Sequence, residues 1–355
     1  MSFVKKSKSY LIVFILIFSF ITLPASRIYA QYATTKVRSV HEAYTDSLKK
    51  VEYDYIFPFL GQGAYKKGFD IPYPVGIMAN YIWLKQGLII SNFQLGLETS
   101  TQDIPLTNVD FIGFGDNTNT SYTVNVRPDI WLLPFLNVYG VFGYGNSETE
   151  VNVIKPINLS SAVKQNISTA GIGTMVAFGL GPVWFSVDAN WTWNKPELLD
   201  KAVYVSVLGV RMGHTFVFKR KPDRNFAIWI GGMRAKMSSE TVGQIQLSEA
   251  IPGLEGKADQ ISADYNAWKD ANYNDLTAAQ KIIVNNVLDP IAERIDEVDG
   301  SAIIKYGMDK QVAQLWNGLI GAQFQFNKHW IIRSEAGVIG DRKSILASVN
   351  YRFLF

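Results

Sequence analysis

The last twelve residues of the chain, Ser344–Phe355, read SILASVNYRFLF and alternate between two faces. One face carries Ile345, Ala347, Val349, Tyr351, Phe353 and Phe355, and the other carries Ser344, Leu346, Ser348, Asn350, Arg352 and Leu354. A period of two predicts a β-strand. Chain ends are usually frayed and polar, and an apolar edge strand in water promotes aggregation. The apolar face is therefore expected to lie against a protein core or against lipid.

The same alternation recurs through most of the chain. In residues 183–193 the apolar set Val183, Phe185, Val187, Ala189, Trp191 and Trp193 opposes Ser186, Asp188, Asn190 and Thr192. Similar stretches are 76–85, 89–98, 122–127, 208–213, 322–326 and 332–335. Aromatic residues gather at the ends of these stretches. Strands of about ten residues with aromatic ends are what a transmembrane β-barrel requires, because only closure pairs every backbone group in hydrocarbon. A soluble lipocalin-like barrel or a β-sandwich is the alternative.

The N-terminus points to export. Lys5, Lys6 and Lys8 precede the uncharged run YLIVFILIFSFIT, residues 10–22, and small residues end at Ala30. This pattern is typical of a cleaved signal peptide, predicted as residues 1–30. A transmembrane anchor is the alternative, but the run is short for a span of about 20 residues.

The closing stretch NYRFLF, with Tyr351, Phe353 and a C-terminal Phe355, resembles the terminal signal of bacterial outer-membrane β-barrel proteins. The resemblance implies an outer-membrane location, contact with outer-membrane lipid, and recognition of these three residues by the barrel-assembly machinery. The apolar face of residues 345–355 by itself already predicts that the last strand meets lipid and closes the barrel against the first. No functional subfamily follows from the resemblance.

We predict an all-β, antiparallel transmembrane barrel over residues 51–355 with about twelve strands, in a range of ten to fourteen. Eleven strands can be read from Gly76 onward, with a short turn at Lys85–Gly87, and the first of them is expected to run toward the periplasm. Residues 51–65 are the candidate twelfth strand, which Pro58 disfavours because proline cannot donate to a ladder; residues 51–75 folded into the lumen are the alternative. Long connections are expected at 99–119, 155–167, 194–201 and 239–312.

Two segments are predicted to be helical. Residues 31–50 form an N-terminal periplasmic or lumenal segment. Residues 259–299 form an insertion between the ninth and tenth strands, in which Thr277 and Gln280 resemble a capping box and Pro290 should kink or split the helix. We interpret this insertion as a loop cap, with a moving gate as the alternative.

Composition excludes several classes of function. Residues 1–30 hold four of the 34 bases and none of the 31 acids, so the mature chain has 30 bases against 31 acids and no signal for nucleic acid. Cysteine is absent, so neither a disulfide framework nor thiol chemistry is expected. No later segment has eighteen consecutive apolar residues, which excludes a helical membrane protein.

No catalytic, metal or cofactor site is predicted. The histidines are His41, His214 and His329, and no serine follows the pattern of an outer-membrane phospholipase near His214. GVFGYG, residues 140–145, lacks the βαβ context of a phosphate-binding loop. A barrel-embedded lipid hydrolase is thus the less favoured alternative.

The polar faces of the strands predict a lumen. Its candidate lining residues are Asn92, Gln94, Asn125, Arg127, Asp129, Asp188, Asn190, Arg211, Gln323, Gln325, Arg333, Glu335 and Arg352. Since twelve strands lie between filled eight-stranded barrels and open porins, a narrow or helix-occluded pore is expected. We predict a narrow or gated channel for a small solute of unspecified identity, with a non-conducting structural or adhesive barrel as the alternative. Arg333, Glu335 and Arg352 are expected to form one lumenal cluster.

Overall fold

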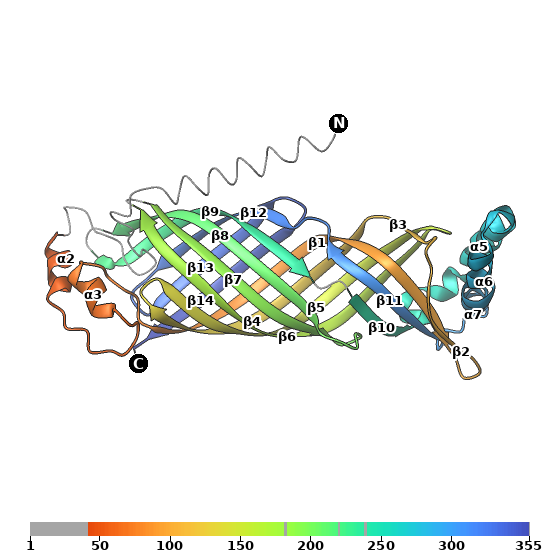
Figure 1. Ribbon diagram of the computed structural model, residues 1–355, viewed down its shortest axis with the longest axis horizontal. Coiled ribbons are helices and arrows are strands. Elements are labelled where there is room, and N and C mark those ends of the chain that lie inside the picture. The colour runs from red at the N-terminus through yellow and green to blue at the C-terminus, as the bar shows by residue number, and fades with distance from the viewer. Residues whose placement is uncertain (1–41, 181–182, 219–220, 238–239, 355) are drawn as a thin grey trace, which may run out of the picture.

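The computed structural model describes residues 42–180, 183–218, 221–237 and 240–354, so the predicted signal peptide, residues 31–41 and Phe355 lie outside it. Ten antiparallel strands form a closed wall (Figure 1). In wall order they are β1 (Val75–Glu98), β4 (Asn117–Leu133), β5 (Leu136–Lys155), β6 (Leu159–Leu180), β7 (Val183–Pro196), β8 (Val203–Phe218), β9 (Lys221–Met237), β12 (Trp316–Gln325), β13 (Trp330–Ile339) and β14 (Lys343–Phe353). β14 closes on β1 from Val75↔Phe353 to Lys85↔Lys343, as predicted for the last strand.

The twelve-strand count is not confirmed. Residues 76–98 were read as two strands with a turn at Lys85–Gly87, whereas β1 continues through them. The polar residues at 85–87 do not form a turn. They mark the point where β1 leaves the belt of outward-facing apolar side chains. Because β1 is antiparallel to β14, it runs away from the end that carries the C-terminus, opposite to the predicted direction. Residues 51–65 supply no strand, and Gly61–Lys66 form the short helix α3.

The wall extends beyond the β13–β14 hairpin at one end. There β11 (Ile303–Val312) pairs with residues 88–98 of β1 and with β10 (Glu240–Gln246). Short strands β2 (Asp103–Asn108) and β3 (Gly113–Phe114) add to β1 and β5. The predicted long loop at 155–167 is mostly strand, since the β5–β6 ladder reaches Val153↔Leu159.

Helices cover this extended end (Figure 1). They are α4 (Leu247–Ala250), the 3-10 turn Leu254–Gly256, α5 (Ala258–Asn272), the 3-10 turn Tyr273–Asp275, α6 (Ala278–Ile283), the π-helical turn Val284–Leu288 and α7 (Asp289–Asp296). They lie between β10 and β11, which is between the seventh and eighth strands of the wall and not the ninth and tenth. The Thr277–Gln280 capping box is confirmed, and Pro290 lies in the first turn of α7. Within the described residues, no helix has the length and apolarity needed to cross a membrane.

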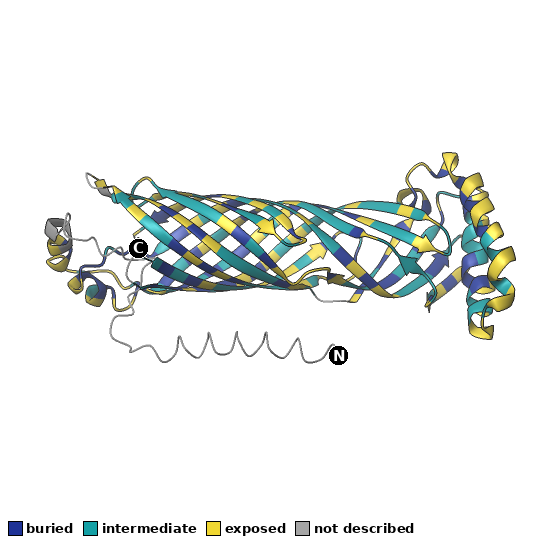
Figure 2. Ribbon diagram, turned by 90° about the horizontal axis from the view of Figure 1, so that it is seen from above, coloured by how far each residue is buried: buried dark blue, intermediate teal, exposed yellow. Residues whose placement is uncertain are grey.

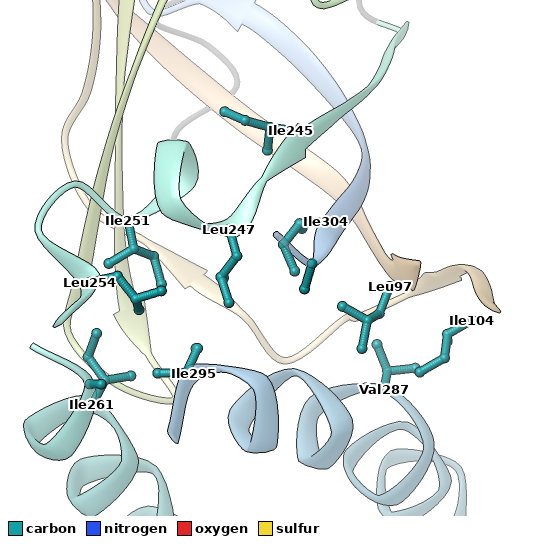
Figure 3. Packing of buried hydrophobic residues seen from close by; sticks show 12 residues of the cluster. Leu97, Ile104, Ile245, Leu247, Ile251, Leu254, Ile261, Val287, Ile295 and Ile304 are labelled. Atoms are coloured by element: carbon teal, nitrogen blue, oxygen red, sulfur yellow. The ribbon is translucent and has the colours of Figure 1, made fainter. Parts of the chain in front are cut away.

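An apolar cluster joins the helices to the strand ends (Figure 3). Leu97 and Ile304 come from β1 and β11, Leu247 and Ile261 from α4 and α5, and Val287 from the turn before α7. All five side chains are buried. Burying such side chains contributes about 1.5–3 kcal/mol each. We call this segment, residues 247–302, the helical cap.

The opposite end carries α2 (Glu42–Lys49) and α3 (Figure 1). Leu48, Ala64, Tyr65, Phe69 and Ile71 form a small core of their own. The backbone N–H of Phe59 donates to the carbonyl of Leu132 at 2.8 Å, which ties residues 51–74 to the end of β4. We call residues 51–74 the mouth segment.

The wall inverts the burial pattern of a soluble domain (Figure 2). On β14, Ile345 and Val349 are 49% and 45% exposed, whereas Arg352 is 4% exposed. Every wall strand repeats this pattern with outward apolar side chains. Large aromatic rings lie near both limits of this apolar belt, exemplified by Trp330 against Tyr351 at one end and Trp193 against Tyr204 at the other. The polar side chains are thereby placed inside.

Candidate functional site

Four charged side chains meet in the middle of the lumen. Arg211 on β8 donates from Nε to Glu335 Oε2 at 2.6 Å and from Nη2 to Glu335 Oε1 at 2.9 Å. Its Nη1 donates to Asp188 Oδ1. Arg333 donates to the same Glu335 Oε2 at 2.9 Å. Two cations and two anions therefore balance, and we call these four residues the charge layer.

An aromatic ring supports the charge layer. Trp229 donates its indole N–H to Glu335 at 2.9 Å, and the guanidinium of Arg333 lies 4.7 Å from the ring centroid. Gly321 is the neighbour of Trp229 across the β9–β12 ladder. A Cβ at Gly321 would overlap the indole, so glycine is what lets the ring lie flat along the wall.

A second arginine stacked on an aromatic ring, again with a glycine opposite the ring, lies on the other side of the lumen. The guanidinium of Arg127 lies 3.8 Å from the ring centroid of Tyr139, and the tyrosine hydroxyl donates to Asn190 at 2.5 Å. Gly173 faces Tyr139 across the β5–β6 ladder, where a side chain would overlap the ring. Asn190 in turn donates to Asp188 at 3.2 Å, which links this group to the charge layer.

A second buried ion pair lies at the mouth. Arg352 donates to Asp129 at 3.0 Å and to the carbonyls of Tyr73 and Pro74 at 2.7 and 3.2 Å. Asn137 also donates to Asp129, at 2.8 Å. Arg352 thus fastens the mouth segment across this end of the lumen.

Lys328 and Asp70 add an ion pair of 2.7 Å between the β12–β13 turn and the mouth segment. Burial disfavours the charged ammonium, but Asp70 more than offsets it and holds the pKa of Lys328 above its ordinary value.

A cavity of about 450 Å³ lies on the helical-cap side of the charge layer and is lined by residues of the wall strands, β10, β11 and their connections. A much smaller cavity of about 50 Å³ lies on the mouth side and is lined by Asp129, Arg333 and Arg352 among others. The larger volume falls in the range of small-molecule sites, about 300–1,000 Å³. We call it the upper cavity.

Two more cations line the upper cavity. Arg342, in the β13–β14 turn, is 2% exposed and donates from Nε to Gln86 at 2.9 Å. Burial lowers the pKa of its guanidinium, an effect that Asp341 opposes. Lys310 on β11 is half-buried, and burial lowers the pKa of its ammonium to about 8. β11 lies beyond the apolar belt, on the helical-cap side.

The structure brings most of the predicted lumen residues together. Asn125, Arg127, Asp129, Asp188, Asn190, Arg211, Gln323, Gln325, Arg333, Glu335 and Arg352 all line one or both cavities. Asn92 and Gln94 do not: they lie at a bulge in the extended part of β1, where Asn92 donates to Asp309 at 2.6 Å. Of the predicted terminal signal, Tyr351 lies in the outer girdle beside Trp330, and Phe353 is paired with Val75.

The predicted cluster of Arg333, Glu335 and Arg352 divides in two. All three lie inside, but Glu335 binds Arg211 and Arg333, while Arg352 binds Asp129. The sequence did not identify Arg211 as the partner of Glu335, or Asp188 as the second acid bonded to Arg211, because register around a barrel cannot be read from one strand.

Sequence reasoning missed other inward residues. Asn80 donates to Asn125 at 2.6 Å, and the inward phase of the 76–85 alternation could have identified it. Lys310 lies in the predicted long connection 239–312, and Arg342 lies in the turn between β13 and β14, so alternation gave no signal for them.

The described residues contain no group of three or more histidine, cysteine or acidic side chains that could hold a metal ion. His329 lies in the β12–β13 turn with Nδ1 2.8 Å from the carbonyl oxygen of Arg352, and His214 packs edge-on against Phe216.

Comparisons with known proteins give only distant structural likeness. No protein-family model matches the chain, and no curated protein matches it. The β domain of the Bordetella autotransporter BrkA is similar at a TM-score of 0.36 and 10% identity, over 79% of this chain and all of that one.

Two further autotransporter structures are comparably distant. The transport unit of AIDA-I from Escherichia coli is similar at a TM-score of 0.31 and 8% identity, over 90% of this chain and all of that one. The translocator domain of NalP from Neisseria meningitidis is similar at a TM-score of 0.32 and 10% identity, over 79% of this chain and 89% of that one. No function follows from likeness at this level.

Proposed function

We propose that this chain is an outer-membrane β-barrel whose lumen is a gated conduit for small solutes, with the upper cavity as its internal binding chamber. The observation that carries the proposal is the cavity of about 450 Å³ inside the closed wall, which the charge layer borders on one side. A rigid structural barrel has no need of such a chamber, because small barrels are ordinarily filled by side chains.

The membrane location is supported by the outer surface. Side chains such as Ile230, Phe142 and Ile172 are 58–59% exposed on separate wall strands. Apolar side chains on every strand, with backbone groups paired around a closed wall, satisfy what hydrocarbon demands. The inward Arg211 and Arg333 avoid a cost of about 2–4 kcal/mol each for arginine near the bilayer midplane.

Gating is supported by three layers that cover the lumen in series. The mouth segment is fastened by Arg352, the charge layer crosses the middle, and the helical cap covers the far end. A permanently open pore would leave the lumen uncovered. A conduit with this arrangement opens only when these contacts are released.

The cap can be removed without breaking the wall. Ser248 and Gly300 are neighbours, with Ser248 N–H donating to the Gly300 carbonyl at 3.3 Å, and Gln246 pairs with Ile303. Replacing residues 249–299 by Asn-Gly should therefore close β10 and β11 as a tight hairpin.

We expect this deletion variant to remain heat-modifiable on gels and to conduct more in planar bilayers than the full chain. The control is Ile282→Ser, which changes an exposed side chain of the cap and leaves it in place. A folded deletion variant with no more conductance than the full chain would favour the non-conducting structural or adhesive barrel.

A cysteine reporter separates access from conduction. The chain has no cysteine, so Val205→Cys in the upper cavity gives a single thiol. A membrane-impermeant maleimide should label it slowly in the full chain and at least tenfold faster in the deletion variant. Equal labelling rates would show that the cap is not a barrier.

The proposed conduit is not an enzyme. Assay of the purified protein against phospholipids tests the less favoured lipid-hydrolase alternative, and sustained turnover would support that alternative instead.

A further inference from the structure

Arg342 presents unsatisfied donors to the upper cavity. It is 2% exposed, and its Nε is bonded to Gln86, but Nη1 and Nη2 are buried with no hydrogen-bond partner among the described residues. The nearest acid, Asp341, accepts from the backbone N–H of Gly87 at 2.6 Å. The two terminal nitrogens of Arg342 are therefore left for something else.

Such an arrangement is costly unless a partner arrives. A buried donor without an acceptor costs about 1–3 kcal/mol, and more when the group is charged. Arginine cannot relieve this by losing its proton. Its paired terminal N–H groups match the two oxygens of a carboxylate, so the missing partner is best supplied by an oxyanion.

Lys310 adds a second cation to the same cavity. Within the described part of the chain, its ammonium makes no hydrogen bond or ion pair, and burial lowers its pKa to about 8. The charged residues that line the upper cavity are Arg127, Asp188, Arg211, Lys310, Arg333, Glu335 and Arg342, five cations against two anions. Both acids are already bonded to Arg211. The chamber therefore holds uncompensated positive charge.

The remaining walls are largely apolar. Apolar side chains that line them include Leu84, Leu88, Val203, Val205, Met237 and Val312. Inorganic anions gain nothing from such walls, whereas a molecule with an apolar body would bury it there at about 25 cal/mol per Å². The positive charge and the apolar walls together favour a ligand that has an anionic head group and an apolar body.

We propose that the upper cavity binds a small amphipathic carboxylate, with its head group on Arg342 and Lys310 and its apolar body against the walls of β1, β8 and β11. This inference rests on the proposed function, since a gated conduit is what gives the ligand access to the chamber. It names the class of solute that such a conduit would hold.

The test is calorimetric titration of the full chain in lipid nanodiscs with octanoate, using octanol as the neutral probe of equal chain length and empty nanodiscs as the blank. Octanoate should bind saturably with one site per chain and at least tenfold more tightly than octanol.

Arg342→Gln and Lys310→Gln should each weaken octanoate at least tenfold and leave octanol nearly unchanged. Lys85→Gln is the matched control. Lys85 precedes Gln86 in the chain, but its own side chain is exposed outside the wall, so the substitution removes a cation that does not line the cavity. Folding of each variant is checked by heat-modifiability.

Equal affinity for octanoate and octanol, or no binding beyond empty nanodiscs, would overturn the proposal without any variant. Undiminished octanoate binding in both folded variants would also overturn it. Because binding is measured without transport, saturable octanoate binding by a chain whose cap deletion does not conduct would reject the conduit and keep the site. Conductance without octanoate selectivity would do the reverse.

Discussion

Arg211 and Glu335 lie 124 residues apart and form a two-pronged ion pair across the lumen, with nitrogen–oxygen distances of 2.6 and 2.9 Å. The pair ties β8 to β13, with β9 and β12 between them in the wall. Since both side chains are almost fully buried, loss of either one leaves its partner as a buried charge with fewer counter-charges. The stability of the barrel therefore depends on this contact more than on any surface charge.

Glu335→Gln should lower the free energy of unfolding by about 3–5 kcal/mol, because it leaves Arg211 and Arg333 with only Asp188 as a counter-charge. Urea unfolding in lipid vesicles measures this. Glu148→Gln removes the acid of an exposed ion pair with Lys164 and should lower the free energy of unfolding by less than about 1 kcal/mol. Equal effects of the two substitutions would mean that the charge layer is not a structural element.

The same Glu335→Gln variant should shift the selectivity of the opened conduit toward anions, since a buried negative charge is removed. Reversal potentials of the cap-deletion background in asymmetric salt measure this shift. An unchanged reversal potential would indicate that ions do not pass the charge layer.

Arg352→Ala should release the mouth segment, because three of its contacts, to Asp129, Tyr73 and Pro74, disappear together. We expect faster proteolysis within residues 51–74 and a selectivity shift toward cations, since Asp129 is left unpaired. Lys328→Gln, which removes only the Asp70 contact, should have a smaller effect. Protection equal to that of the full chain would contradict the fastening role of Arg352.

Octanoate binding should weaken as pH rises through about 8. The pKa of Lys310 in the empty cavity is lowered to about 8, so the ammonium is mostly charged at pH 7 and mostly neutral at pH 9. Octanoate stays ionised over that range, and Arg342, which lines the same cavity, keeps its proton. The affinity should fall about tenfold from pH 7 to pH 9 if the charged form alone binds. In Lys310→Met the affinity should be lower at pH 7 and flat with pH, and a pH slope retained there would assign the titration to another group.

Gly321→Ala should destabilise the barrel by about 1–3 kcal/mol, because the new Cβ would overlap the indole of Trp229 and move a ring that bonds Glu335. Gly232→Ala is the matched control, as its Cβ would meet Trp316 at an ordinary 3.6 Å. Urea midpoints of the two variants should differ clearly, and coincident midpoints would argue against close packing at Trp229.

Deleting Phe355, or replacing it with Asp, should impair assembly if the terminal aromatic residues are recognised by the barrel-assembly machinery. The amount of heat-modifiable protein in the outer-membrane fraction measures this. Leu354→Asp, at the adjacent position, is a control for charge at the chain end. Normal levels of the Phe355 variants would show that pairing of β14 with β1 suffices for closure.

The alternation of SILASVNYRFLF and its counterparts determined the fold class and the inward face of the wall strands, except at residues 89–98, where a bulge in β1 shifts the phase. This works because a strand sends successive side chains to opposite sides, so a single stretch such as 344–353 shows which residues meet lipid and which meet the lumen. The capping box of Thr277 and Gln280 was predictable for the same reason: its partners are three residues apart and their geometry is local.

Only the tertiary structure decided what is joined across the barrel. Strand count and ladder register depend on closure around ten strands, which is why β1 was divided in two and why Arg352 was expected in one cluster with Arg333 and Glu335. β11 pairs with β1 beyond the β13–β14 hairpin and so extends the wall around the upper cavity. This pairing brings Lys310 to the cavity that Arg342 lines from the β13–β14 turn. No local pattern links these two cations, since they share one cavity only because β11 and β14 pair with successive parts of β1.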